Sequence, residues 1–196
     1  GRYPDLPILP VCADYTQTLR LPDEVDGSRP RLAFFPGSTI GNFERPEAVA
    51  FLRRLRGLLD RGDRLLIGVD LRKDPAVLEA AYNDAAGVTA AFNLNLLHRL
   101  NRELDADFDV DAFEHDAPWV EDRGRIEMHL VSRRDQAAHV DGARFEFTAG
   151  ERIHTESSHK YELDDFAALA HEADFERESV WTDDDRLFSV QLFRAG

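Results

Sequence analysis

The stretch Leu32–Phe43, Leu-Ala-Phe-Phe-Pro-Gly-Ser-Thr-Ile-Gly-Asn-Phe, constrains the fold more than any other part of the chain. Its apolar start is typical of a buried strand, and a Pro-Gly pair ends that strand. A Gly-Asn turn pair follows, and Pro46–Asp60 carries apolar residues at helical spacing behind a proline at the helix start. A strand, a sharp polar turn and a helix form the layout of a ligand site at the carboxyl edge of a parallel sheet. The alternative is an ordinary βα connection, which also needs a polar turn with glycines.

The next elements continue the alternation of strand and helix. We expect Gly62 to cap the Pro46–Asp60 helix, and the apolar run Arg64–Asp70 predicts the next strand. Asp74 is a predicted N-cap, followed by proline at the first helical position, for a helix that reaches about Asp84. This order is typical of a parallel α/β sheet.

The segment ahead of this unit is predicted to hold another strand. Leu6–Tyr15 predicts a loop and then a strand, and an aspartate at the end of a parallel strand, here Asp14, can face a bound nucleotide. Cys12 lies in this apolar run and is expected in the core. As the single cysteine of the chain, it excludes an intramolecular disulfide and a cysteine-based zinc site. The polar stretch Gln17–Arg29 predicts a short helix or loop.

The pattern changes after Gly87. Val88–Leu104 predicts a helix, and short strand-like runs follow between turn signals, of which Asp-Gly at Asp141 is the strongest. The predicted strands are Glu114–Trp119, Arg125–Ser132, Ala137–Val140, Ala143–Thr148 and Arg152–Tyr161. We therefore predict an antiparallel β-rich insertion in an α/β chain.

The chain closes with a predicted helix over Leu163–Ala173 and an antiparallel strand pair, Phe175–Thr182 and Arg186–Arg194. The predicted domains are residues 1–86 as part of a Rossmann-like core, 87–162 as the insertion, and 163–196 as the last helix and strand pair of the core.

The amino-acid composition limits the kinds of molecule that the protein is expected to bind. The 196 residues carry a net charge of −14 and are 43% hydrophobic, so the chain can bury a core under an acidic surface. Such a surface disfavours nucleic acid and anionic membranes. No apolar run approaches the ~18 residues of a membrane span, and no signal peptide is recognisable. We expect a cytoplasmic protein that binds neither nucleic acid nor membranes.

Five stretches resemble the motifs of the histidine-specific, S-adenosylmethionine-dependent methyltransferases. They are Phe34–Phe43, Gly68–Asp74, Ala81–Asn95, Asn101–Leu104 and Ile153–Tyr161, and the likeness runs from about Tyr3 to Leu192. The resemblance implies a class I (Rossmann-like) methyltransferase fold with the antiparallel insertion as substrate-binding part. It implies S-adenosyl-L-methionine (SAM) as methyl donor and trimethylation of the α-amino group of L-histidine, the first step of ergothioneine synthesis.

One part of the family pattern is not recognisable in the chain. A class I methyltransferase opens with a strand and a glycine-rich loop for the methionine end of the cofactor, and an acidic residue follows on the next strand. We therefore expect the N-terminal strands to be missing and the chain to be the C-terminal two-thirds of such an enzyme, starting at Arg2-Tyr3-Pro4 before the third strand. Alone, such a fragment is expected to be inactive.

On the cofactor side, the resemblance assigns Asp14, Tyr15 and Gly37. Asp14 matches the family aspartate that binds the adenine amino group, and Gly37 lets the backbone approach the cofactor. The alternatives are a solvated carboxylate at a strand end and a simple turn glycine.

On the substrate side, the resemblance assigns Asn42 and Tyr82 to the substrate carboxylate and Glu156 and Ser158 to the imidazole ring. A carboxylate accepts from one ring N–H while a hydroxyl meets the other ring nitrogen, and two residues that alternate in a strand face the same side. Further pocket residues implied by the resemblance are Thr89, Phe92 and Met128. The resemblance assigns no catalytic group within the chain.

Several alternatives stay open. Asn42 can be a left-handed turn residue, and packing in the core is the alternative for Tyr82, Phe92 and Met128. For Glu156 and Ser158 the alternative is a strand edge at the surface. His154 and His159 lie close to Glu156, but their spacing and the lack of thiols predict no metal site. Two other functions compete: a methyltransferase of the same fold acting on another amino acid or amine, and a non-catalytic binding module.

Overall fold

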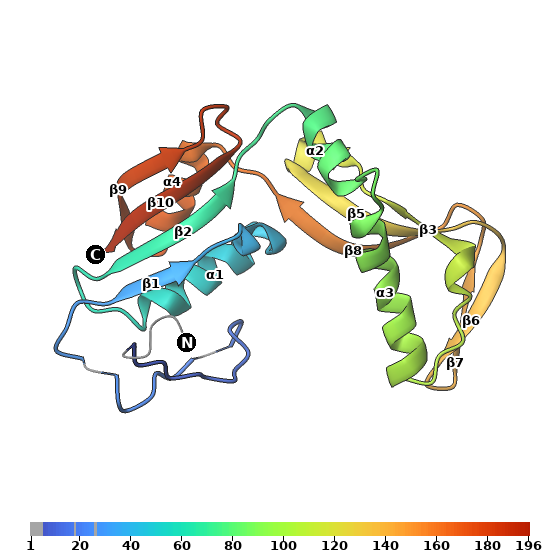
Figure 1. Ribbon diagram of the computed structural model, residues 1–196, viewed down its shortest axis with the longest axis horizontal. Coiled ribbons are helices and arrows are strands. Elements are labelled where there is room, and N and C mark those ends of the chain that lie inside the picture. The colour runs from blue at the N-terminus through green and yellow to red at the C-terminus, as the bar shows by residue number, and fades with distance from the viewer. Residues whose placement is uncertain (1–5, 18, 26) are drawn as a thin grey trace. The chain divides into compact units, whose positions relative to one another are not determined.

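A computed structural model describes residues 6–17, 19–25 and 27–196 (Figure 1). The start predicted at Arg2-Tyr3-Pro4 lies outside these residues. The chain forms two compact units. Unit 1 holds the described residues up to Thr39 together with Glu44–Val69 and Glu162–Gly196, and unit 2 holds Ile40–Phe43 and Asp70–Tyr161.

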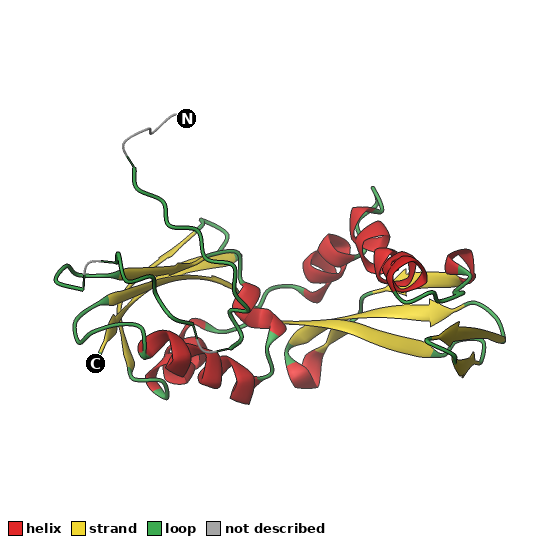
Figure 2. Ribbon diagram, turned by 90° about the horizontal axis from the view of Figure 1, so that it is seen from below, coloured by secondary structure: helices red, strands yellow, loops and turns green. Residues whose placement is uncertain are grey.

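Unit 1 is a four-stranded sheet in the order β1-β2-β10-β9. Its strands are β1 (Leu32–Phe35), β2 (Arg64–Asp70), β9 (Phe175–Thr182) and β10 (Phe188–Ala195). β1 and β2 are parallel, and β9 and β10 are antiparallel. Helices α1 (Arg45–Arg56) and α4 (Leu163–His171) lie on one face of the sheet (Figure 2). A parallel pair followed by a terminal antiparallel pair confirms the predicted α/β class.

The core of unit 1 follows from the apolar spacing of α1 and α4. Ala48, Phe51 and Leu52 of α1 are at most 1% exposed, as are Phe166 and Leu169 of α4. Burying side chains of the size of Phe51 and Leu52 contributes about 1.5–3 kcal/mol each to folding.

The two ends of α1 show why it is shorter than predicted. Glu44 and Glu47 form a capping box at its start, with Pro46 in the first turn. The helix ends at Arg56, and Gly57 is its C-cap. The expectation that Gly62 caps it was wrong: Gly62 lies in the following turn with φ of 89° and donates its N–H to the Ala195 carbonyl.

The strand predicted within Leu6–Tyr15 is not formed. The described residues of this segment have no strand ladder, and its apolar side chains, including Ile8 at 74% and Val11 at 53%, are exposed. Cys12 is exposed as well, which corrects its placement in the core. A strand is stabilised by its ladder partners, and this segment has none among the described residues.

Unit 2 is built around the central strand β5 (Arg125–Ser132). β8 (Arg152–His159) pairs with one edge of β5, and β3 (Phe113–Asp116) and β4 (Trp119–Val120) pair with the other, all antiparallel. Helices α2 (Pro75–Tyr82) and α3 (Val88–Glu103) cover one face of this sheet (Figures 1 and 2). Two short 3-10 helices, η2 (Val110–Ala112) and η3 (Glu121–Arg123), lie in this unit, as do Ile40–Asn42 of a third, η1 (Thr39–Asn42).

A β-hairpin, β6 (Gln136–Val140) and β7 (Ala143–Phe147), extends unit 2. Its turn residues Asp141 and Gly142 have φ of 48° and 78°, the conformation that a tight two-residue hairpin requires. The Asp-Gly turn signal of the sequence is thereby confirmed.

The strand predicted over Glu114–Trp119 is interrupted between β3 and β4. Asn83, just after α2, donates to the Ala117 carbonyl at 2.9 Å and accepts from the Ala117 N–H at 3.0 Å. These bonds take the backbone groups that a continuous strand would use in its ladder.

The long segment of unit 2 starts at Asp70, whereas the sequence suggested an insertion over residues 87–162. The difference lies in α2, which packs through Leu78 against Ile126 and Met128 of β5. Among the described residues, no helix combines the length and the apolar character needed to cross a membrane.

Candidate functional site

The three residues assigned to the cofactor lie in unit 1. The Asp14 carboxylate accepts from the backbone N–H and the hydroxyl of Thr16 at 2.8 and 2.6 Å, and these bonds hold its pKa below the ordinary range. Tyr15 packs its ring against Phe35 and Phe51, each with ring centroids 6.1 Å away. Asp14 is therefore an ionised acceptor in a turn and not at the end of a strand.

Gly37 lies in the turn after β1 with φ of 75°, and a Cβ built on it would meet nothing within 4 Å. The turn is close to β2, because a Cβ on Gly68 would lie 3.1 Å from the Gly37 nitrogen. An exposed backbone turn and an ionised carboxylate, both in unit 1, suit the amino and hydroxyl groups of a nucleoside. The residues present thus fit part of a SAM site.

Asn42, predicted to bind the substrate carboxylate, is the last residue of η1 in unit 2. The neighbouring residue, Gly41, holds η1 against β8, because His159 Nδ1 donates to the Gly41 carbonyl at 3.0 Å. A Cβ on Gly41 would lie 2.7 Å from the His159 backbone oxygen, so only glycine allows this approach. Asn42 itself is exposed and available to a ligand.

A β-bulge in β8 determines which side chains share a face. Met128 pairs with Glu156 and His129 with His154, so Thr155 is the extra residue. Cross-strand partners share a face. Glu156 and Ser158 therefore lie on the Met128 side, toward α2, while the bulge moves His154 to the opposite face.

Tyr82 and Ser158 meet on this face in a buried polar cluster. Tyr82 Oη and Ser158 Oγ are 2.7 Å apart. Lys160, next in the same alternation, donates to Ser158 Oγ at 2.7 Å and to Tyr82 Oη at 2.8 Å. Its side chain is 1% exposed, and its ammonium lies 2.8 Å from Asp70 Oδ2.

Glu156 lies at the edge of this cluster and is half-buried. Burial raises the pKa of its carboxyl, and the positive charge of Lys160 opposes the rise. The described residues offer its carboxylate no hydrogen-bond partner, and a partly desolvated acceptor without a donor is a feature of a binding site.

The remaining predicted pocket residues lie in α3 and β5. Thr89 is half-buried in the first turn of α3, where its N–H and that of Val88 donate to Asp84 and lower the pKa of Asp84 to about 2. Phe92 is 63% exposed, which excludes the core alternative for it in this structure. Met128 is 3% exposed and packs with Ile126 and Leu78.

Sequence reasoning missed Lys160, Asp70, Lys73 and Asn83. Lys160 continues the two-residue alternation of Glu156 and Ser158, and Asp70 and Lys73 belong to the Gly68–Asp74 motif, so the signal was present. The sequence pattern did not predict that Lys160 would be buried, because lysine side chains are almost always exposed unless they are paired.

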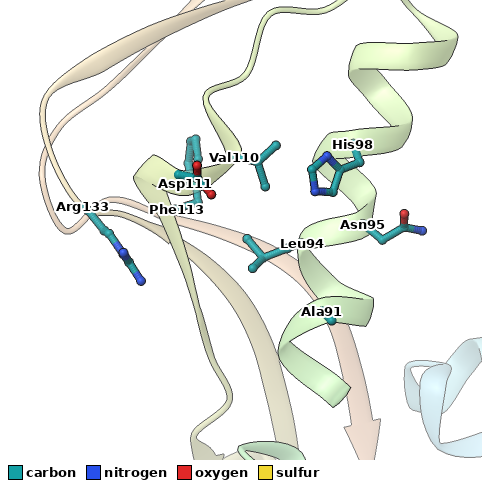
Figure 3. Close-up of a pocket in the computed structure, with 8 residues that line it drawn as sticks. All are labelled: Ala91, Leu94, Asn95, His98, Val110, Asp111, Phe113 and Arg133. Atoms are coloured by element: carbon teal, nitrogen blue, oxygen red, sulfur yellow. The ribbon is translucent and has the colours of Figure 1, made fainter. Parts of the chain in front are cut away.

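An open hollow of about 570 Å³ elsewhere in unit 2 contains none of the predicted site residues. It is lined by α3, by the segment around Val110–Phe113 and by Arg133 (Figure 3). No group of three or more histidine, cysteine, aspartate or glutamate side chains within the described ranges is arranged to hold a metal ion.

Comparisons with known proteins point to one family. The chain is 44% identical over 194 residues to histidine N-alpha-methyltransferase of Mycolicibacterium smegmatis and 42% identical over 192 residues to that of Mycobacterium tuberculosis. The alignments cover 98% and 97% of this chain and 60% and 59% of the relatives. The chain thus spans about 60% of the length of these relatives.

A solved structure supports the fold. The CcbJ methyltransferase of Streptomyces caelestis matches with a TM-score of 0.50 and 14% identity over 96% of this chain and 68% of that one. A sequence profile described as "Histidine-specific methyltransferase, SAM-dependent" matches residues 1–195. The chain therefore belongs to the family of histidine-specific, SAM-dependent methyltransferases.

Proposed function

We propose that the protein containing this chain transfers methyl groups from SAM to the α-amino group of L-histidine and forms the trimethylated product, as in ergothioneine synthesis. One observation carries this proposal beyond family membership: the half-buried Glu156 carboxylate shares a face with the Ser158 hydroxyl. An acceptor and a hydroxyl on one face suit a ring with two nitrogens.

Each end of the amino acid has its own residues in unit 2. Asn42 and Tyr82 bind the substrate carboxylate in this proposal, because an amide and a phenol can donate to it without adding charge. Glu156 and Ser158 bind the imidazole, and Thr89, Phe92 and Met128 line the pocket. Holding both ends of histidine fixes the position of the α-nitrogen and its lone pair, and such orientation is a large part of catalysis of methyl transfer.

The cofactor side of the proposal rests on unit 1. Asp14 accepts from the adenine amino group, Tyr15 lies beside it, and the Gly37 backbone approaches the nucleoside. When bound, SAM supplies an electrophilic methyl group on its sulfonium. Family membership and the fit of Asp14 and Gly37 support this assignment.

We further propose that the 196-residue chain by itself binds SAM weakly and has little activity, because the sequence contains no Gly-x-Gly-x-x-Gly loop for the methionine end of the cofactor. Isothermal titration of the chain with SAM measures this directly. A micromolar dissociation constant would show that the cofactor site does not need such a loop.

The function itself is tested by incubating the full-length protein with SAM and a panel of histidine, tryptophan, phenylalanine and histamine. Mass spectrometry should show one, two and three added methyl groups on histidine and little product from the others. Tryptophan is included because a relative from Psilocybe serbica, named L-tryptophan methyltransferase, is 29% identical over 177 residues. Preferred methylation of tryptophan or histamine would reject histidine as substrate, and no methylation at all would favour a binding module.

A further inference from the structure

Lys160 carries a positive charge inside unit 2. Its side chain is 1% exposed, and a buried ammonium is stable only when it is paired and hydrogen-bonded. Its charge partner is Asp70 at 2.8 Å, but the other oxygen of Asp70 binds Lys73 at 2.5 Å. One carboxylate therefore serves two ammonium groups, and its negative charge is shared between Lys160 and Lys73.

The backbone fixes this arrangement. Leu71 and Tyr161 form a parallel bridge, in which the Tyr161 N–H donates to the Asp70 carbonyl and the Arg72 N–H to the Tyr161 carbonyl, both at 3.1 Å. Asp70 and Lys160 each precede a residue of the bridge. Their side chains thus start from positions set by the main chain.

The donor hydrogen atoms of Lys160, Tyr82 and Ser158 can be matched to their acceptors. An ammonium has three N–H donors, and those of Lys160 match three acceptors at hydrogen-bond distance: Asp70, Ser158 and Tyr82. The Tyr82 and Ser158 hydroxyls are 2.7 Å apart, so one of them donates to the other. Of their two hydroxyl protons, a single one remains for a ligand.

We propose that Lys160 is a positioning residue of the amino-acid site, whose ammonium, anchored on Asp70, orients the Tyr82 and Ser158 hydroxyls so that the pair offers one donor proton to the substrate. The inference rests on the proposed function, which places these two hydroxyls at opposite ends of an amino acid. When Tyr82 donates to Ser158, the Ser158 proton is free for an unprotonated ring nitrogen. When Ser158 donates to Tyr82, the Tyr82 proton is free for the substrate carboxylate. The two contacts are thereby coupled through one proton.

The first test replaces Lys160 by methionine, whose side chain is of similar length but has no N–H donor. Lys73→Met is the matched control, since Lys73 binds the other oxygen of Asp70 and no contact joins it to either hydroxyl in the described part of the structure. Full-length wild-type protein is first assayed with the amino-acid panel, and all variants are then assayed with its best substrate. Failure of the histidine assignment consequently leaves the test of Lys160 intact.

We expect Lys160→Met to raise KM for the amino acid about 10- to 100-fold, the range for losing hydrogen bonds to a charged group. Lys73→Met should change KM less than about 3-fold, because Asp70 keeps Lys160 as its charge partner and Lys73 contacts neither hydroxyl among the described residues. Lys160→Gln, which keeps N–H donors, should recover part of the loss, and KM for SAM should stay within about 2-fold of wild type, as expected for separate sites. Equal effects of the Lys160 and Lys73 variants, or a parallel rise of KM for SAM, would overturn the proposal.

A second test does not depend on the folding of a Lys160 variant. In Tyr82→Phe the remaining Ser158 proton can reach the ligand, and in Ser158→Ala the Tyr82 proton can do so. The double variant has neither, so its loss of affinity should exceed the product of the two single losses by about 10-fold, a coupling typical of neighbouring groups. A loss equal to that product would mean that each hydroxyl donates independently, and the proposal would fail.

Discussion

The backbone oxygen of His159 occupies the space that a side chain at residue 41 would need. A Cβ on Gly41 would lie 2.7 Å from that oxygen, and the His159 ring donates to the Gly41 carbonyl at 3.0 Å. This contact holds the segment that carries Asn42 against the strand that carries Glu156 and Ser158. The glycine of the Gly-Asn pair is thus explained by close approach and not by a positive φ.

Gly41→Ala is expected to destabilise the protein by about 1–3 kcal/mol, because backbone atoms must move to accept the methyl group. It should also weaken histidine binding, since Asn42 moves with the segment. Thermal unfolding and titration with histidine measure the two effects.

Gly27→Ala is a suitable control for this variant. A Cβ on Gly27 would approach only the flexible end of Arg31, at 3.2 Å. Its effect should stay within about 0.5 kcal/mol, as for most surface substitutions. Equal stability of the Gly41 and Gly27 variants would show that η1 is not packed on β8 in this way.

Asn42→Ala should weaken histidine binding by about 1.5–3 kcal/mol, the usual loss for a hydrogen bond to a charged group. Asn42 is exposed and its side chain supports no described element, so the melting temperature should not change. Titration of the full-length protein with histidine and, separately, with SAM separates the two sites. Unchanged histidine affinity would remove Asn42 from the substrate site.

Glu156→Gln should make the protein more stable at neutral pH. Burial raises the pKa of Glu156 in the folded state, so the folded protein binds a proton more tightly than the unfolded chain does. Wild-type stability therefore falls as pH rises from the unfolded value of about 4.5 through the folded pKa, and glutamine avoids this loss.

The measurement is the melting temperature of both proteins from pH 3.5 to 8. The melting temperature of the glutamine variant should exceed that of wild type by a margin that grows as pH rises. The margin should disappear near pH 4, where Glu156 is protonated in both the folded and the unfolded state. A gain that does not depend on pH would mean that burial does not perturb Glu156.

The sequence predicted those elements that local patterns determine. The limits of β2, β5 and β9 match the prediction, because each is an uninterrupted apolar or alternating run between turn residues. The Asp141-Gly142 hairpin and the Asp74 cap of α2 follow from turn and cap chemistry, and Asp74 accepts from Ala76 at 2.8 Å as expected.

Long-range contacts determined what the sequence did not predict. The bulge at Thr155 is fixed by the register of β8 against β5, and the break at Ala117 by two bonds to Asn83 from a different element. Burial of Lys160 depends on Asp70, which is distant in the chain. For the candidate site, the structure brings Tyr82, Ser158 and Glu156 to one face of unit 2, and their roles toward a substrate stay predictions.

In the proposed site, Glu156 selects the imidazole ring. The most direct test is the ratio of kcat/KM for histidine over phenylalanine in the full-length protein, before and after Glu156→Leu, with the exposed Glu151→Leu as control. A carboxylate in a half-buried site disfavours binding of a ring without N–H. In Glu156→Leu, turnover of histidine should fall and the penalty against phenylalanine should be relieved, so the ratio should fall at least about 10-fold. Glu151→Leu should leave the ratio unchanged. A ratio that stays the same in Glu156→Leu would mean that Glu156 does not bind the ring, and the assignment of histidine specificity to this strand would be wrong.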